Sequence, residues 1–264
     1  LPSAERISVM AAVIMLVYAL NQFMELPSRT IELQIPGLFV RIELTDSVIT
    51  AMLAAGIAAA GADWLLRDHP VRNKQLLFPH LLLPAITALV IGIPLNQMEF
   101  SLIWWVGLLA GTILLVLVLV AEYIVIDTQD VRQPLAAASL TAVGFAIYLV
   151  LATTMKAAGT RLFFILPALV IATWLVSVRS LSLRLHGEWV VYEAAIVSLV
   201  VVQMAAAIHY WPLTPLRFGL ILLGPAYALT SLIIGLIEEK PVSRLVMEPV
   251  IVLGLSWLSA VLLA

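Results

Sequence analysis

The chain has 264 residues, of which 63% are hydrophobic and 11% are charged. Soluble globular domains have roughly 45–50% apolar and about 25% charged residues, and a mean hydropathy of +1.10 exceeds what a soluble interior of this size can bury. The composition therefore excludes a soluble protein and indicates a membrane protein. The chain has no cysteine, which excludes disulfides and thiolate metal sites, and its net charge of −2 gives no case for a nucleic-acid partner.

A helix that spans the bilayer needs about 20 mostly apolar residues. About nine stretches of the sequence meet this requirement, at residues 6–24, 47–66, 76–95, 100–122, 134–156, 161–182, 189–210, 215–236 and 243–263. The remaining connections are too short for a soluble catalytic domain. We therefore interpret residues 1–264 as a single polytopic transmembrane domain, all-α in class, whose first span is retained rather than cleaved as a signal peptide.

The segment 30–44, between the first and second spans, is not helical in pattern. Apolar and polar residues alternate on each side of Pro36-Gly37, which is typical of a β-hairpin. Because an isolated hairpin is marginally stable in water, we expect it to lie over the exterior ends of the helices or against a partner.

Prolines and small residues mark special positions along the spans. Pro79, Pro84 and Pro94 interrupt the third span, and Pro225 interrupts the eighth, so both are candidates for discontinuous helices. The second span contains Gly56-x-x-x-Ala60 and the fourth contains Gly107-x-x-x-Gly111. Such pairs let helix backbones approach closely, usually inside a bundle and sometimes at a dimer interface.

Basic residues in the short loops predict the orientation. With nine spans, the side that holds the N-terminus carries nine Lys and Arg residues and the opposite side carries five. This asymmetry favours a protein of the plasma (inner) membrane with a cytoplasmic N-terminus and an exterior C-terminus.

Ionisable residues within the spans are the candidates for a functional site, because burying a charge in a membrane is costly. Glu248 is the strongest candidate, since it lies roughly 10 Å into the ninth span at 1.5 Å per residue. Glu193, Glu122 and Asp63 lie about one turn inside other spans, and Arg179 lies at a similar level in the sixth. Glu248, Glu193, Glu122 and Arg179 form a candidate substrate site, although residues near a helix end also reach the interface by extending along the helix.

Other motifs give weaker signals. Asp127 and Asp130 in one loop resemble a pair that holds Mg²⁺ against a diphosphate, but they lack supporting residues. His80 and His209 lie at opposite faces, so they cannot both ligate one haem iron. Lys156 ends the fifth span instead of lying at mid-membrane, which argues against a retinal Schiff base. We expect no catalytic residues, no metal and no cofactor.

Three functions remain open. The first is a non-enzymatic structural, assembly or accessory component of a membrane complex, which contacts lipids and either a protein partner or a second copy of the chain. The second is a carrier for a small or amphiphilic solute that uses the carboxylate and arginine cluster. The third is a membrane-embedded enzyme that acts on lipid headgroups through Asp127, Asp130 and a metal.

Overall fold

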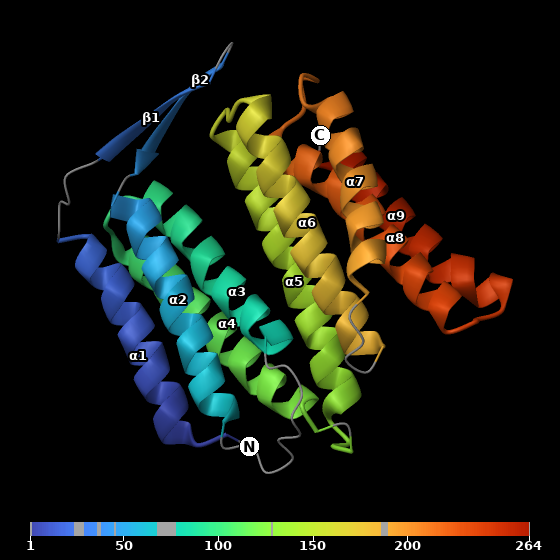
Figure 1. The fold of residues 1–264 in the computed structure, drawn as a ribbon, viewed down its shortest axis with the longest axis horizontal. Coiled ribbons are helices and arrows are strands. Elements are labelled where there is room, and N and C mark those ends of the chain that lie inside the picture. Colours follow the sequence, from blue (N-terminus) through green and yellow to red (C-terminus); the bar gives the residue numbers. More distant parts are fainter. Residues whose placement is uncertain are drawn as a thin grey trace. The chain divides into compact units, whose positions relative to one another are not determined.

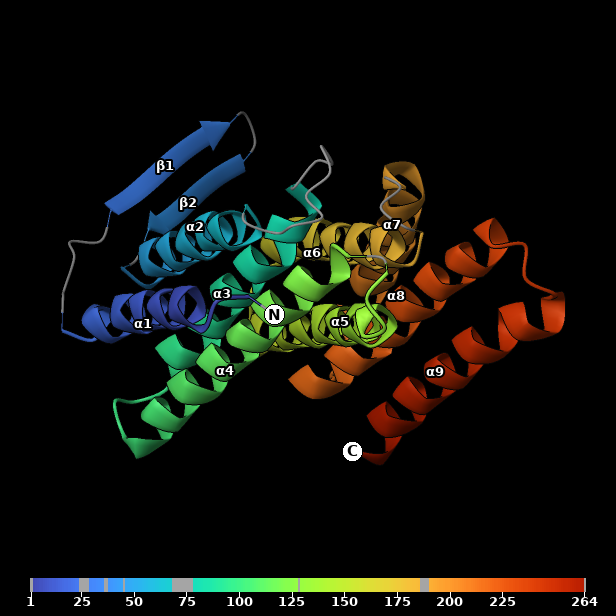
Figure 2. The ribbon, with the colours of Figure 1, turned by 90° about the horizontal axis from the view of Figure 1, so that it is seen from below.

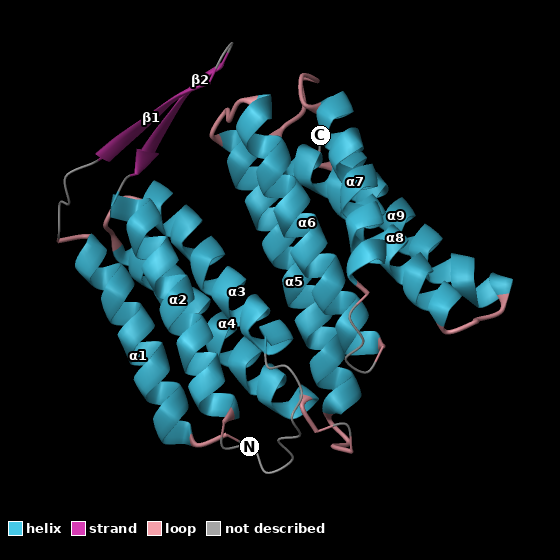
Figure 3. Cartoon of the chain, viewed as in Figure 1, coloured by secondary structure: helices cyan, strands magenta, loops and turns pink. Residues whose placement is uncertain are grey.

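The structure is a computed structural model that describes residues 2–23, 29–35, 38–44, 46–67, 78–127, 129–185 and 190–263. Within these ranges, nine helices are long and apolar enough to cross a membrane, as the sequence predicts (Figures 1 and 3). The protein is therefore a polytopic integral membrane protein. The helices are α1 (Ala4–Asn21), α2 (Asp46–Leu66), α3 (Phe78–Gln97), α4 (Leu102–Val125), α5 (Gln133–Ala157), α6 (Leu162–Arg184), α7 (Val191–Ile208), α8 (Pro215–Ile237) and α9 (Val242–Leu262).

The segments with internal prolines form continuous helices. Helix α3 contains Pro84 and Pro94, and α8 contains Pro225, yet neither is divided into two pieces. Proline also stands in the first turn of α5 and of α8, where its missing N–H removes no helical hydrogen bond. The sequence-based candidates for discontinuous helices are thus ordinary spans.

Two strands lie between α1 and α2. Strands β1 (Arg29–Ile35) and β2 (Leu38–Leu44) pair antiparallel. The register places Ile31 opposite Ile42 and Leu33 opposite Val40, so the apolar positions of the alternating pattern pair with each other. The expected Pro36-Gly37 turn lies outside the described residues, and the exterior location of the hairpin stays a prediction.

The chain divides into two compact units, residues 1–126 and 127–264. In the first unit, α2 packs along α3, and α1 and α4 complete the helix contacts. In the second unit, α5, α6, α7 and α8 contact one another in a ring, and α9 packs along α8 (Figure 2). Each unit has its own apolar core, which the first unit builds around Trp104 and the second around Phe218.

Small residues bring helices together at some of the expected positions but not at all of them. A side chain at Gly111 of α4 would collide with Ile91 of α3, so this glycine serves packing inside the first unit. On α2, in contrast, the fully buried small residues are Ala54 and Ala58. Gly56 and Ala60 are exposed, and no atom lies within 4 Å of the position that a Cβ on Gly56 would occupy.

We predict that Gly219→Ala destabilises the second unit. A Cβ at Gly219 would lie 2.6 Å from Thr153 Cγ2 and 2.8 Å from Leu149 Cδ1, so these side chains or the two helices must shift. Such overpacking costs about 1–3 kcal/mol of unfolding free energy, measured as a lower thermal midpoint in detergent. Gly56→Ala makes the same chemical change in open space and should not lower the midpoint. Equal midpoints for the two variants would contradict the close contact.

Candidate functional site

Glu248 lies in the second turn of α9 and contacts two other helices of the second unit. The hydroxyl of Tyr227 in α8 donates a hydrogen bond to Glu248 Oε1 across 2.7 Å. Arg184, the last residue of α6, places Nη2 3.8 Å from the same oxygen. The Glu248 side chain is 43% exposed, so its carboxylate is held by a hydroxyl and a guanidinium at the edge of the helices. This arrangement joins α9 to α8 and α6.

Glu122 belongs to the first unit and is fully buried near the end of α4. Its Oε2 atom lies 2.9 Å from Nδ1 of His80, which stands in the first turn of α3. The pair links two consecutive antiparallel helices. A buried carboxylate needs such a partner, because an unpaired one would carry a large desolvation penalty.

Arg179 is buried within a segment of α6 in which every residue from Val176 to Leu183 is buried. Its Nη1 atom lies 3.4 Å from the hydroxyl of Ser182 one turn later. Nearby, the hydroxyls of Ser177 and Thr230 are 3.1 Å apart and connect α6 to α8. This part of α6 is therefore a polar stretch inside the second unit.

Glu193 lies in the first turn of α7 and is half-buried. It takes part in none of the side-chain contacts of Glu248, Glu122 or Arg179 described above. The sequence does not predict the contacts that these three residues make, and Glu122 is in a different unit from the others. Their joint action as one substrate site stays a prediction.

His80 and Tyr227 are the contact residues that sequence reasoning missed. His80 has a detectable signal, because it stands near the start of one span while Glu122 stands near the end of the next. Consecutive spans run antiparallel, so these two positions lie at similar depth. Tyr227 gives no comparable signal, since its contact with Glu248 depends on how α8 and α9 are rotated about their axes.

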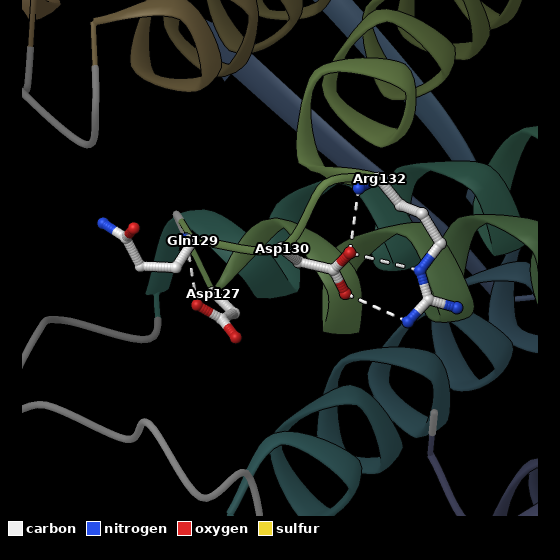
Figure 4. Close-up of polar contacts among 4 residues, drawn as sticks. All are labelled: Asp127, Gln129, Asp130 and Arg132. Carbon is white, nitrogen blue, oxygen red and sulfur yellow. Dashed lines mark hydrogen bonds and ion pairs between the residues drawn. The ribbon is translucent and has the colours of Figure 1, made fainter.

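The carboxylates of Asp127 and Asp130 make separate hydrogen bonds within their loop. Asp127 Oδ1 accepts the backbone N–H of Gln129 at 3.0 Å, whereas Asp130 turns toward Arg132 (Figure 4). Asp130 accepts two hydrogen bonds from the Arg132 guanidinium, each at 3.1 Å, and one from its backbone N–H at 2.8 Å. These bonds hold the pKa of Asp130 below its usual value, the guanidinium being the larger cause. In the described ranges no group of three or more His, Asp or Glu residues is arranged to hold a metal ion. The contacts of this loop therefore give no support to an enzyme that acts through a metal held by Asp127 and Asp130.

Near the N-terminus, the first unit has a cavity of about 560 Å³ that Arg6, Trp64 and Tyr123 help to line. The Arg6 guanidinium donates to the Trp64 carbonyl at 3.1 Å and stands 4.8 Å from the centre of the Trp64 ring. Asp63, one of the span-end carboxylates, accepts a hydrogen bond from Arg67 Nε at 2.9 Å. These contacts stabilise the end of α2 and are typical of the membrane interface.

We predict that Tyr227→Phe lowers the unfolding free energy by about 0.6–1.5 kcal/mol, because it removes the hydrogen bond to Glu248 and leaves the ring in place. Thermal unfolding of the purified protein in detergent measures the change. Tyr192→Phe removes an equal hydroxyl from a residue that is 84% exposed and should leave the midpoint unchanged. If the two variants have the same thermal midpoint, the Tyr227 contact does not hold α9 to α8.

No curated protein and no solved structure matches the chain. One family model, described as "Protein of unknown function (DUF5656)", matches residues 26–263, which include β1, β2 and every described helix after α1. The chain therefore belongs to the family DUF5656, whose function is unknown.

Proposed function

We propose that this protein is a non-enzymatic structural, assembly or accessory component of a membrane complex. The observation that carries the proposal is the outward-facing pair Gly56-x-x-x-Ala60 on α2. Both residues are exposed, and open space lies beside Gly56. Small residues at this spacing let the backbone of another membrane helix approach closely, which is a main source of helix association in lipid.

The surroundings of this pair fit a docking face. Met52 and Leu53, one turn before Gly56, are 61% and 55% exposed. Long apolar side chains beside a small-residue groove provide the ridge and the hollow that two packed helices need. The partner is a membrane-embedded protein helix, from another chain or from a second copy of this one.

The polar groups within the spans also support a structural role. Tyr227–Glu248 joins α8 to α9, and His80–Glu122 joins α3 to α4. In each pair the carboxylate is engaged by a neighbouring helix of its own unit. Groups used in this way stabilise helix packing and need no substrate to satisfy them.

Photo-crosslinking tests the docking face. A photoreactive residue in place of Met52 should form one discrete protein adduct in native membranes, because the partner helix lies against it. The matched control is Leu109 of α4, which is 53% exposed and should crosslink to lipid. If both positions give lipid adducts alone, the docking proposal is wrong. A doubled mass for the adduct identifies a second copy, whereas any other discrete mass identifies a different chain.

We further propose that the protein lies in the plasma (inner) membrane with its N-terminus cytoplasmic and its C-terminus and hairpin exterior, on the basis of the Lys and Arg asymmetry. Because the chain has no native cysteine, single thiols report the orientation directly. An impermeant maleimide should label Ala158→Cys in intact cells. Gln129→Cys, at the opposite end of α5, should react only after permeabilisation. The reverse pattern would contradict this orientation.

A carrier is the second candidate, and the 43% exposure of the Glu248 side chain beside Arg184 favours it. A carrier needs water to reach this carboxylate within the membrane. The same impermeant maleimide distinguishes the two functions when it is applied to Glu248→Cys from both sides of the membrane. Rapid labelling supports the carrier, whereas an unreactive thiol removes it.

A further inference from the structure

The second unit has one end that is basic and contains no acidic residue. The end of α5 and the start of α8 meet there at Thr153 and Gly219, and the end of α7 joins them through the hydrogen bond of Lys156 to the His209 carbonyl. The start of α6 lies beside the end of α7, because Arg161 and His209 line the same cavity (Figure 1). The charged or titratable groups of these helix ends are Lys156, Arg161, His209, Tyr210 and Arg217, and none of them is a carboxylate. The sequence has no Asp or Glu between residues 131 and 187 or between residues 194 and 237. These four helix ends therefore carry no Asp or Glu side chain as a counter-charge.

Other basic residues in the described ranges behave differently. Four of them form ion pairs within the chain, namely Arg67 with Asp63, Arg132 with Asp130, Arg184 with Glu248 and Lys240 with Glu238. The basic end departs from this pattern. A cluster of cations without acids at the edge of a membrane protein calls for an anion from outside the chain.

A cavity of about 620 Å³ opens at this end, between the α5–α6 loop and the end of α7. Its lining includes Thr160, Arg161, Phe163, His209 and Tyr210. Arg161 immediately precedes α6, and its side chain makes no hydrogen bond that caps the helix. The first backbone N–H groups of a helix attract anions, so the start of α6 and the Arg161 guanidinium both favour a negatively charged ligand.

His209 gives independent evidence for a ligand. Its residue surface is 9% exposed, it lines the cavity, and its buried Nδ1 atom has no hydrogen-bond partner among the described residues. Burial, assisted by the charge of Lys156, lowers the pKa of His209 below its usual value. Arg217 Nε is likewise buried without a partner. Buried polar atoms are normally hydrogen-bonded, so each of these two nitrogens leaves an interaction incomplete at this end of the unit.

Lys156 fixes the geometry of this end. Its ammonium donates a hydrogen bond to the backbone carbonyl of His209 and stands 5.2 Å from the centre of the Phe218 ring. The His209 ring packs edge-on against Tyr210, with the ring centres 4.9 Å apart. The imidazole is thus held by its neighbours, and the positive charge of Lys156 is kept beside the cavity.

We propose that this end binds a phosphate group in the cavity, which Arg161 contacts by charge and His209 contacts by a hydrogen bond, while Arg217 adds positive charge at the start of α8. Guanidinium groups match the geometry of phosphate oxygens, and the exposed rings of Phe163 and Tyr210 suit the apolar part of an amphiphile. The phosphate is carried either by an anionic phospholipid or by a soluble ion. The proposal does not depend on the docking face of α2.

The test measures binding to the purified, full-length protein in neutral detergent. Phosphatidylglycerol, phosphatidylcholine and inorganic phosphate are titrated separately, and thermal midpoints give the apparent affinity. We expect phosphatidylglycerol to stabilise the protein more than phosphatidylcholine does. Each of Arg161→Gln and Arg217→Gln should weaken this binding about fivefold, since one basic residue near an anionic lipid contributes about 1 kcal/mol.

Arg132→Gln is the matched control, because it removes the same charge from an arginine that Asp130 already neutralises. It should bind phosphatidylglycerol as the unmodified chain does. Arg161 is exposed, so its substitution should leave the packing of the unit intact. Arg161→Gln therefore still tests the proposal if Arg217→Gln fails to fold. Stabilisation by inorganic phosphate alone, weakened by the same variants, supports the soluble source. If Arg161→Gln and Arg132→Gln bind every probe equally, the proposal is overturned.

Discussion

The structure depends on the need to satisfy polar groups where there is no water. In the hydrocarbon core an unpaired backbone N–H or C=O costs several kcal/mol, which leaves the helix as the way for this chain to cross. The same constraint governs the small polar side chains within the spans. Thr87, Thr112 and Thr230 each donate their hydroxyl to the carbonyl four residues earlier, at 2.7–2.8 Å. These hydroxyl groups are thus hydrogen-bonded within their own helix.

Charged residues extend this rule from one helix to pairs of helices. Glu122 lies too deep in the first unit for water to solvate it, and His80 of the neighbouring helix supplies the partner. Glu248 is closer to the surface, where its carboxylate contacts both Tyr227 and Arg184. These pairs add specificity to helices whose apolar surfaces would otherwise pack in many ways. Such pairs support the structural or assembly role that we propose.

The two proposals concern different surfaces and different partners. Gly56 and Ala60 offer a shallow apolar groove on α2, which suits another helix. The basic end of the second unit offers charge and unsatisfied nitrogen atoms, which suit a phosphate group. The groove and the basic end share one property, because each leaves an interaction incomplete within the chain. A protein that binds lipid phosphate at one surface and a helix at another is well suited to an accessory role in a membrane assembly.

The sequence by itself determined the nine spans, because burial in lipid depends on the summed hydropathy of about 20 consecutive residues, which is a local property. It also indicated the depth of Glu248 and Glu122, since depth follows from the distance along a helix. Only the tertiary structure decided that Tyr227 and His80 are their partners, that Ala54 and Ala58 are buried while Gly56 faces outward, and that Lys156 reaches His209. These contacts depend on which helices are neighbours and on how each is rotated about its axis. A helix that is apolar on every side leaves that rotation unspecified in its sequence, because lipid and protein interior are equally favourable surroundings for its side chains.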